Sequence, residues 1–472
     1  MLSVPSAAAE FSGAPLGDAR LSQRAVSLAE CLSRRPSAGF PSVFGDEAEL
    51  EAFYRFVNND SVSPAAVLAP HHERSWVRSL AAGPTVLVLH DTSEFKFSGD
   101  GVREGLAASG EKQSFHGHAA IAVGEDEAPV VHGVVGFDAY VLQDGVWSGA
   151  GPGRELEPLV VGSERWSLLA EEARLQAPEE LQLVHVMDRE ADDYGLWTRI
   201  VEGGDDFVIR AQNDRRVTDS AKRLYAQGRQ QEFVVSRTVT LSRRRSKAPP
   251  RSRKTHPDRD VRDARLSIRA CSVEVIRPEA VAPLGQETMA LSFVEVVEMD
   301  PPDGVEPVHW RLLSTLPIDT AEQVLRVVDI YRKRWLIEEF FKALKTGCSA
   351  EKRQGRSLWS LLNTTALLIP VAWRLLCLRT AARHQPKEPL EEHLDAVEMQ
   401  ALRHLDKGKR LPTTPTVGDG LLAVARLGGH LRSNGEPGWL VLGRGLERLI
   451  EFADGWRAAL ASVDRSGSTT DL

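Results

Sequence analysis

Apolar runs of strand length alternate with helix-like segments through the first half of the chain. Residues 84–97, PTVLVLHDTSEFKF, open with a β-branched apolar run that predicts a buried strand followed by a second extended piece. Residues 181–187, LQLVHVM, predict another apolar strand. Further extended segments are expected over 117–124, 129–141 and 206–211, and helices over 19–32, 47–58, 163–176 and 191–202. Strands that alternate with helices predict an α/β core, here preceded by a small helical domain.

The pattern changes after residue 212. Strand-like runs alternate with basic or Pro/Gly-rich loops over 213–315, which indicates a β-rich insertion. Helices are then expected over 320–346, 357–382, 389–405 and 441–462, with a looser stretch at 408–440. The predicted domains are a helical domain (1–80), an α/β core in two parts (81–212 and 316–382), the β-rich insertion between those parts (213–315), and a C-terminal helical domain (383–472).

The helix expected over 320–346 carries a polar stripe opposite an apolar face. Asp319 is its expected N-cap, with Glu322 completing a capping box, and Gly347 is its expected stop. At about 100° per residue, one narrow stripe contains Tyr331, Arg334, Glu338, Lys342 and Lys345. The opposite face contains Leu336, Ile337, Phe340, Ala343 and Leu344, with Lys333 as an exception. Ion pairs between residues four apart would explain these charges on an ordinary amphipathic helix.

Two aspartates follow apolar runs. Asp91 and Asp188 are each expected to close a strand, where an open α/β sheet usually presents its ligand site. Two such carboxylates on neighbouring strands could share metal ions. An aspartate also ends a strand because it starts a turn or caps a helix, and for either residue alone that explanation is the stronger one. A third carboxylate in the polar stripe, Glu338, favours the metal site.

Composition narrows the class of protein. The 472 residues are 42% hydrophobic and 26% charged, as in a globular protein of two to four domains. The four cysteines form no CxxC pair, so we expect neither a zinc site nor a disulfide framework, and a cytoplasmic location. The N-terminus lacks a signal-peptide pattern, and no apolar run of membrane-spanning length is found. No glycine-rich nucleotide loop stands out, so no nucleotide cofactor is expected.

Charge gives a mixed indication. The net charge of −8 argues weakly against a nucleic-acid partner, so local basic clusters matter more. The densest cluster lies beside Pro249 and Pro250 and has the composition of a loop. It contains Arg243, Arg244, Arg245, Lys247, Arg251, Arg253 and Lys254. On charge alone a solvated loop is expected, and a phosphate-tracking loop only if the rest of the chain indicates DNA.

The paired histidines carry little signal. His116 and His118 form a lone HxH, which is more often structural or solvent-facing than a metal site. His71 and His72 are expected at the surface.

Several blocks, in the same order along the chain, are similar to one known family. Tyr331, Arg334, Glu338 and Lys345 match the Y-(2)-R-(3)-E-(6)-K signature of the insertion-sequence-four transposases, the group of the Tn-five transposase. The surrounding stretch RVVDIYRKRWLIEEFFKALKTG resembles this group well beyond those positions. Similar blocks are LGDAR, FYRFVNN, HDTSEF at Asp91, MDREAD at Asp188, FVIRAQ, WRLLSTLPI and PGWLVLGRG. The segment between the two aspartates matches the group only loosely.

The resemblance implies a cut-and-paste DDE transposase with an α/β fold and an RNase H-like core. Asp91, Asp188 and Glu338 would be the catalytic triad and would hold two Mg²⁺ ions, which Mn²⁺ can replace. Two such ions can hold the attacking and leaving oxygens of a phosphodiester. The β-rich segment would be the insertion between the second Asp and the Glu. The N-terminal helices would read transposon-end DNA, and the C-terminal helices would pair two subunits into a homodimer.

The same resemblance implies DNA contacts. Phosphates near the cleavage point would be contacted by Tyr331, Arg334, Lys342, Lys345 and Arg210. Trp310 and Trp335 would receive a flipped base while a hairpin forms at the cleaved end. Packing in the core is the alternative for both tryptophans.

Three functions stay open at this point. The first is an active transposase that joins freed 3′-hydroxyl ends to target DNA, the second a nuclease without strand transfer, and the third a non-enzymatic DNA-binding protein. In the last helix Leu446, Leu449, Phe452, Trp456 and Ala459 recur at steps of three and four residues, which predicts a dimerisation helix. Intramolecular packing of the same residues is the alternative.

Overall fold

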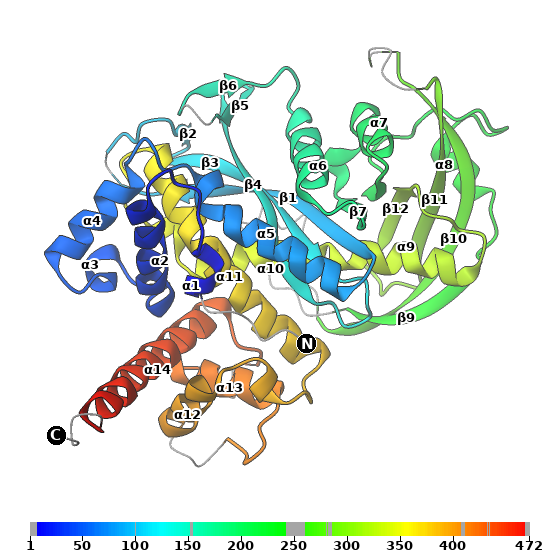
Figure 1. The fold of residues 1–472 in the computed structure, drawn as a ribbon. Helices are drawn as coiled ribbons and strands as arrows, with labels where there is room; N and C mark the ends of the chain where they lie inside the picture. Colours follow the sequence, from blue (N-terminus) through cyan, green and yellow to red (C-terminus); the bar gives the residue numbers. More distant parts are fainter. Residues whose placement is uncertain are drawn as a thin grey trace. The chain divides into compact units, whose positions relative to one another are not determined.

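The protein divides into two compact units (Figure 1). Unit 1 contains Met1–Gln182 and Trp335–Leu472, and unit 2 contains Leu183–Arg334. The structure is a computed structural model. It describes residues 7–99, 101–151, 154–241, 260–279, 281, 286–406, 411–431, 433 and 435–467. The basic cluster of residues 243–254 lies outside these ranges.

Unit 1 begins with short helices that are capped by small polar side chains. Their bounds are α1 Ala7–Phe11, α2 Ala19–Arg34, α3 Phe40–Val43, α4 Glu47–Val57 and α5 Pro64–Ala82. Asp18 accepts a hydrogen bond from Arg20 N at the start of α2, and Asp46 accepts one from Glu49 N at the start of α4. The helices expected over 19–32 and 47–58 are therefore confirmed.

An antiparallel sheet follows in unit 1. Its strands are β1 Thr85–Phe97, β2 Ala107–Ser109, β3 Lys112–Val123, β4 Val131–Gln143, β5 Val146–Ala150 and β6 Leu156–Pro158. They lie in the order β6-β5-β4-β3-β1, and β2 pairs with β3. The helices α5, α6 (Glu164–Gln176) and α11 (Leu358–His384) pack against β4 (Figure 1).

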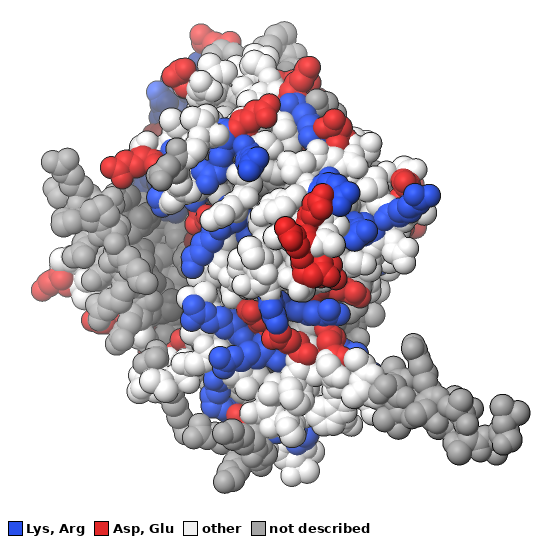
Figure 2. Space-filling model, turned by 90° about the vertical axis from the view of Figure 1, so that its left-hand side faces the viewer, with Lys and Arg blue, Asp and Glu red and all other residues white. Residues whose placement is uncertain are grey.

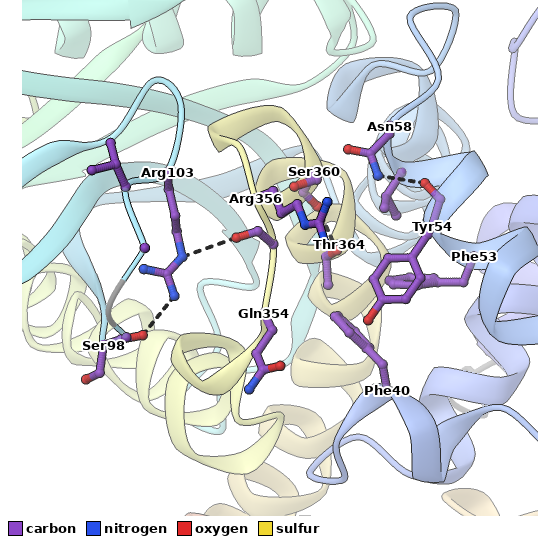
Figure 3. A pocket seen from close by; sticks show the side chains of 15 residues that line it. Phe40, Phe53, Tyr54, Asn58, Ser98, Arg103, Gln354, Arg356, Ser360 and Thr364 are labelled. Carbon is purple, nitrogen blue, oxygen red and sulfur yellow. Dashed lines mark hydrogen bonds between the residues drawn. The ribbon is translucent and has the colours of Figure 1, made fainter. Parts of the chain in front are cut away.

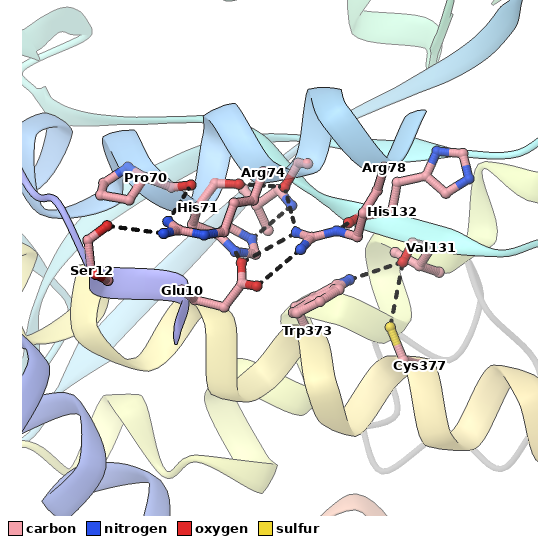
Figure 4. A network of polar contacts seen from close by, with 12 residues as sticks. Glu10, Ser12, Pro70, His71, Arg74, Arg78, Val131, His132, Trp373 and Cys377 are labelled. Carbon is pink, nitrogen blue, oxygen red and sulfur yellow. Dashed lines mark hydrogen bonds and ion pairs between the residues drawn. The ribbon is translucent and has the colours of Figure 1, made fainter. Parts of the chain in front are cut away.

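A buried polar network ties α1 to α5 and β4 (Figure 4). His71 donates from Nδ1 to Glu10 Oε2 at 2.5 Å and accepts the Val134 amide at Nε2 at 3.0 Å, which is the pattern of a neutral imidazole. Burial lowers the pKa of His71, in agreement with that state. Arg78 donates to Glu10 Oε1 at 2.9 Å and balances its charge. The expectation that His71 and His72 lie at the surface is wrong, because α5 turns both rings inward, where they are 0% and 7% exposed.

Buried neutral histidines make unit 1 sensitive to acid. Burial lowers the pKa of His72 and His118 to about 3 and that of His132 to about 4. A folded pKa below the unfolded value of about 6.5 means that stability is present above pH 6.5 and is lost as the pH falls. Each of these histidines lowers the free energy of unfolding by about 2 kcal/mol when the pH is reduced from 7 to 5. We expect the thermal midpoint to drop by several degrees over this interval and to drop less in His72→Gln. Midpoints that do not change with pH would contradict this expectation.

One described helix, α11, is long and apolar enough to cross a membrane. Of its most apolar window, 89% is buried inside the protein. Its polar side chains also bond within unit 1, as when Asn363 Nδ2 donates to Val57 O at 3.0 Å. The burial is that of a core helix.

The C-terminal helices pack within unit 1. They are α12 Ala396–Leu405, α13 Val417–Leu427 and α14 Trp439–Gly467. α13 falls in the stretch that was expected to be loose. Leu446 and Leu449 of α14 are buried, at 2% and 0% exposure, so the intramolecular alternative holds for these two residues.

Unit 2 is built on one sheet. Its strands are β7 Gln182–Met187, β8 Asp206–Arg210, β9 Val235–Leu241, β10 Arg262–Ile276, β11 Thr288–Met299 and β12 His309–Ser314. Its helices are α7 Tyr194–Glu202, α8 Leu224–Arg229 and α9 Ala321–Lys333. β7 and β8 are parallel and are connected through α7, whereas β12, β11, β10 and β9 continue from β8 as antiparallel strands. The β-rich segment thus extends the sheet that contains β7 and β8.

The helix expected over 320–346 is divided into three pieces. α9 ends at Lys333, α10 (Trp335–Lys342) follows, and a π-helical segment covers Ala343–Gly347. Unit 2 ends at Arg334, between α9 and α10. The expected apolar face is confirmed, since Leu336, Ile337, Phe340, Ala343 and Leu344 are all buried.

The capping box of α9 lies one residue later than expected. Thr320, not Asp319, is the N-cap, and its hydroxyl accepts from Gln323 N at 3.3 Å. Gln323 Oε1 accepts in return from Thr320 N at 3.1 Å. Both registers place a suitable pair of side chains three residues apart, so the sequence pattern could not choose between them.

Candidate active site

Two of the three carboxylates belong to unit 1. Asp91 lies in the middle of β1, paired with Ala119 of β3, and not at the end of a strand as expected. The strand continues because its pairing with β3 runs without interruption from Leu87 to Phe97. Residues 86–90 are buried and residues 91–94 are half-buried, so Asp91 is the first residue at which β1 becomes accessible to solvent. Its Oδ1 accepts the amide of Thr92 at 2.9 Å.

Glu338 lies on α10, which packs against β1 through Phe341 and Phe95, with ring centroids 6.2 Å apart. Glu338 is half-buried, whereas the next residue, Glu339, is 5% exposed. Glu339 pairs with Lys342 at 3.0 Å, Arg379 at 3.5 Å and Arg383 at 3.4 Å. These partners give Glu339 a structural role and separate it from Glu338.

The lysines that follow Glu338 have protein partners in unit 1. Lys345 donates to Ser93 Oγ at 2.7 Å and to Glu94 O, both on β1. Burial lowers the pKa of Lys345, and Asp91 is among the charges that act on it. The structure therefore brings Lys345 to the accessible stretch of β1.

Lys342 and Trp335 form a pair at the surface of α10. Lys342 Nζ lies 4.3 Å from the centroid of the Trp335 ring. Trp335 is 50% exposed, so packing in the core does not account for it.

The third carboxylate belongs to unit 2. Asp188 follows β7, as expected, and is half-buried. Its Oδ1 accepts the amide of Glu190 at 2.8 Å and so caps the 3₁₀ turn Arg189–Ala191. This cap is the structural role that a strand-end aspartate commonly has.

Four of the residues expected to contact DNA gather near Asp188 in unit 2. Tyr331 is 6% exposed, and its ring lies 5.7 Å from that of Trp310 in an edge-on contact. Burial raises the pKa of Tyr331, and Arg334, Arg210 and Asp188 are the charges that act on it. Arg210 also donates to His309 O at 3.2 Å. An aspartate, two arginines, a tyrosine and a tryptophan thus share one neighbourhood.

The predicted metal ligands fit a hard divalent cation in their chemistry. All three are carboxylates, and oxygen ligands are those that Mg²⁺ and Mn²⁺ prefer. The described part of each unit contains no group of three or more His, Cys, Asp or Glu side chains arranged to hold a metal ion. A site made from the three predicted ligands would need residues of both units, since Asp91 and Glu338 belong to unit 1 and Asp188 to unit 2.

Sequence reasoning missed a polar chain beside Asp91. Thr92 Oγ1 lies 2.8 Å from His118 Nδ1 and accepts from Arg165 Nε at 3.3 Å. Arg165 lies over the Trp147 ring at 4.5 Å. The HxH pattern at residue 118 was the available signal, and His118 proves to be fully buried and structural.

Sequence reasoning also left Arg353 without a role. Arg353 is 4% exposed, and its guanidinium donates to Cys348 O at 2.9 Å and to Pro36 O and Ala38 O. Burial lowers the pKa of Arg353 to about 10. Arg353 therefore links the chain after the π-helical segment to the loop that follows α2.

The protein's surface combines both signs of charge. Figure 2 shows Lys and Arg side chains interspersed with Asp and Glu on one face. A mixture of both signs agrees with the net charge of −8. We therefore expect phosphate groups to be contacted by local groups of basic residues.

Two family models match the chain. Residues 5–62 match the family described as transposase DNA-binding, and residues 166–369 match the one described as transposase DDE domain. The first range contains α1, α2, α3 and α4. The second contains Asp188, Glu338 and every residue expected to contact DNA, whereas Asp91 precedes it. The chain therefore belongs to the DDE transposases, with a transposase DNA-binding domain at its N-terminal end.

Proposed function

We propose that the protein is a cut-and-paste transposase of the insertion-sequence-four group. It binds the inverted repeats at transposon ends, cleaves DNA there and joins the freed 3′-hydroxyl ends to target DNA. The match to the DDE domain carries this proposal, together with the YREK signature inside the matched range. In this assignment the α/β fold contains an RNase H-like core that the β-rich segment interrupts.

Asp91, Asp188 and Glu338 are proposed to hold two Mg²⁺ ions. When bound, the ions supply charge neutralisation for the attacking and leaving oxygens of the phosphodiester. The chain's own contribution is the orientation of the carboxylates. Asp91 is fixed by continuous pairing of β1 with β3, Asp188 by its cap on the 3₁₀ turn, and Glu338 by the buried face of α10.

The DNA strand is proposed to lie along basic side chains from both units. Arg334 and Arg210 offer planar guanidinium groups suited to phosphate, and Lys342 and Lys345 offer point charges. The buried Tyr331 positions the arginines beside it and presents its hydroxyl to the same strand. Trp310 and the exposed Trp335 are proposed to stack on a flipped base if cleavage passes through a hairpin.

Strand transfer distinguishes this function from that of a nuclease. With DNA that carries the inverted repeats flanking the coding region, and with Mg²⁺, we expect the protein to release ends and then insert them into a supercoiled plasmid. Gel analysis of joined products measures this. Nicked products that are never inserted would favour the nuclease, and no reaction in Mg²⁺ or Mn²⁺ would favour a non-enzymatic DNA-binding protein.

A homodimer is proposed for the DNA-bound state. Leu446 and Leu449 are buried in unit 1, so two subunits would have to pair through the later turns of α14, where Ala459 and Leu460 are exposed. Light scattering with and without end DNA measures the change in mass.

A further inference from the structure

A cavity of about 680 Å³ lies in unit 1 beside the match to the DNA-binding family (Figure 3). Its volume is within the range typical of sites for small ligands. One side comes from α3 and α4, a second from residues 98, 99 and 101–103, and a third from residues 354–356 with the first turns of α11. The cavity lining includes Phe40, Tyr54, Asn58, Arg103, Gln354 and Arg356.

One wall of the cavity is an aromatic surface. Phe53 is fully buried and packs on Phe40, with ring centroids 4.4 Å apart. Tyr54 meets both rings edge-on, at 5.6 Å and 6.0 Å, yet remains 37% exposed. The buried rings fix Tyr54 while part of its surface faces the cavity (Figure 3). A fixed, accessible ring is suited to stacking on a planar ligand.

The opposite wall is cationic. Arg103 is held in place, because it donates from Nε to Gly355 O at 3.1 Å and from Nη2 to Ser98 O at 2.8 Å. Arg356 is exposed and also lines the cavity. This wall is therefore suited to an anion.

The remaining polar groups are those of a hydrogen-bonding site. Asn58 donates to Tyr54 O at 2.7 Å, which leaves its amide oxygen for a ligand. Gln354 adds an exposed amide, whereas the hydroxyl groups of Ser360 and Thr364 are buried and donate to backbone carbonyls, so that they can only accept from a ligand. Amides can pair with both the donors and the acceptors of a nucleobase edge.

We propose that this cavity binds one unpaired nucleotide, with its base against Tyr54 and its phosphate at Arg356 and Arg103. The nucleotide belongs either to an unpaired strand of bound DNA or to a free mononucleotide. The DNA source rests on the proposed function. Because the cavity joins α3 and α4 to the loop that Arg353 anchors, an occupied cavity would connect end recognition to the segment that follows Glu338.

Quenching of 2-aminopurine tests the proposal. The probe is a thymidine single strand of about ten residues with one central 2-aminopurine deoxynucleotide, mixed with the full-length protein in EDTA. Stacking on Tyr54 is expected to quench the probe on binding. We expect Tyr54→Ala to remove the quenching and to weaken binding about ten- to a hundredfold, while Tyr54→Phe keeps both. We expect Arg356→Ala to weaken binding and to make it less dependent on salt, with partial recovery in Arg356→Lys.

Two controls separate this result from others. Arg216→Ala removes an exposed arginine of unit 2 and is expected to bind the probe like the wild type. The probe is bound in EDTA and is not cleaved, so failure of the catalytic assignment and failure of the cavity assignment appear in different measurements. Thermal midpoints of all variants report whether they are folded.

Competition identifies the source of the nucleotide. Displacement of the probe by thymidine monophosphate supports a free mononucleotide, and displacement only by unlabelled single strand supports DNA. Complete displacement by inorganic phosphate alone would overturn the proposal, because the base would then make no contribution. Unchanged quenching in both Tyr54→Ala and Arg356→Ala would also overturn it.

Discussion

Replacing Glu338 with glutamine is expected to slow Mg²⁺-dependent cleavage of end-bearing DNA by about a thousandfold and to leave the protein folded. Glu338 is half-buried on α10, and the proposed role gives its charge to a metal ion. An amide cannot supply that charge. A loss of several kcal/mol of transition-state stabilisation, at about 1.4 kcal/mol per tenfold, gives this magnitude. Single-turnover cleavage rates and the thermal midpoint are the measurements.

The neighbouring glutamate provides a matched control. Glu339→Gln removes a buried carboxylate from ion pairs with Lys342, Arg379 and Arg383, of which only Arg379 is largely buried. Because solvent screens the other two pairs, the substitution costs about 1–2 kcal/mol, and the thermal midpoint should fall by a few degrees. Cleavage by the folded fraction should stay within about tenfold of the wild type, because this carboxylate has no proposed part in the chemistry. If the two variants lose activity equally, the assignment of Glu338 is wrong.

Gly443→Ala is expected to destabilise the protein by about 2 kcal/mol or more and to slow cleavage as well. A Cβ at Gly443 of α14 would overlap the carbonyl oxygen of Gly347. The atoms nearest to this Cβ all belong to the backbone of Gly347, so the overlap can be relieved only if α14 or the segment around Gly347 moves. Gly347 ends the π-helical segment that carries Lys345, and the displacement would therefore reach a residue that contacts β1. Urea denaturation and cleavage rates measure the two effects.

The same helix contains its own control. A Cβ at Gly455 would meet nothing within 4 Å, so Gly455→Ala should stabilise α14 by about 0.5–1 kcal/mol through helix propensity alone. If Gly443→Ala and Gly455→Ala destabilised the protein equally, overlap with Gly347 would not explain the effect at Gly443.

Much of the fold could be predicted from local pattern. The strand runs around residues 85–89 and 181–187 are apolar and β-branched, and they do form β1 and β7. The four strand-like runs after residue 230 correspond to β9, β10, β11 and β12. These elements follow from side-chain periodicity, which acts over a few residues. Asp188 was placed correctly for the same reason, since β7 ends at Met187.

Features that depend on tertiary contacts could not be predicted in this way. β1 continues past Asp91 because β3 supplies a partner for every residue up to Phe97, and such pairing is not visible in the local sequence. His71 is polar, and its burial depends on Glu10, a partner 61 residues away. α13 was missed because four of its eleven residues are polar or glycine and fall among loops. The convergence of the three carboxylates remains a prediction.

The anchoring of the N-terminal segment bears on how such proteins can evolve. Asn363 bonds to Val57 O and Val62 O, and Arg353 bonds to the carbonyls of Pro36 and Ala38. Both side chains come from the DDE match, and their partners lie inside it or inside the range 5–62. If residues 5–62 alone were exchanged for those of another protein, the buried guanidinium of Arg353 and the buried amide of Asn363 could lose their backbone hydrogen-bond acceptors. New end specificity should therefore arise more readily by point substitution on the exposed faces of α2 and α4 than by shuffling of whole modules.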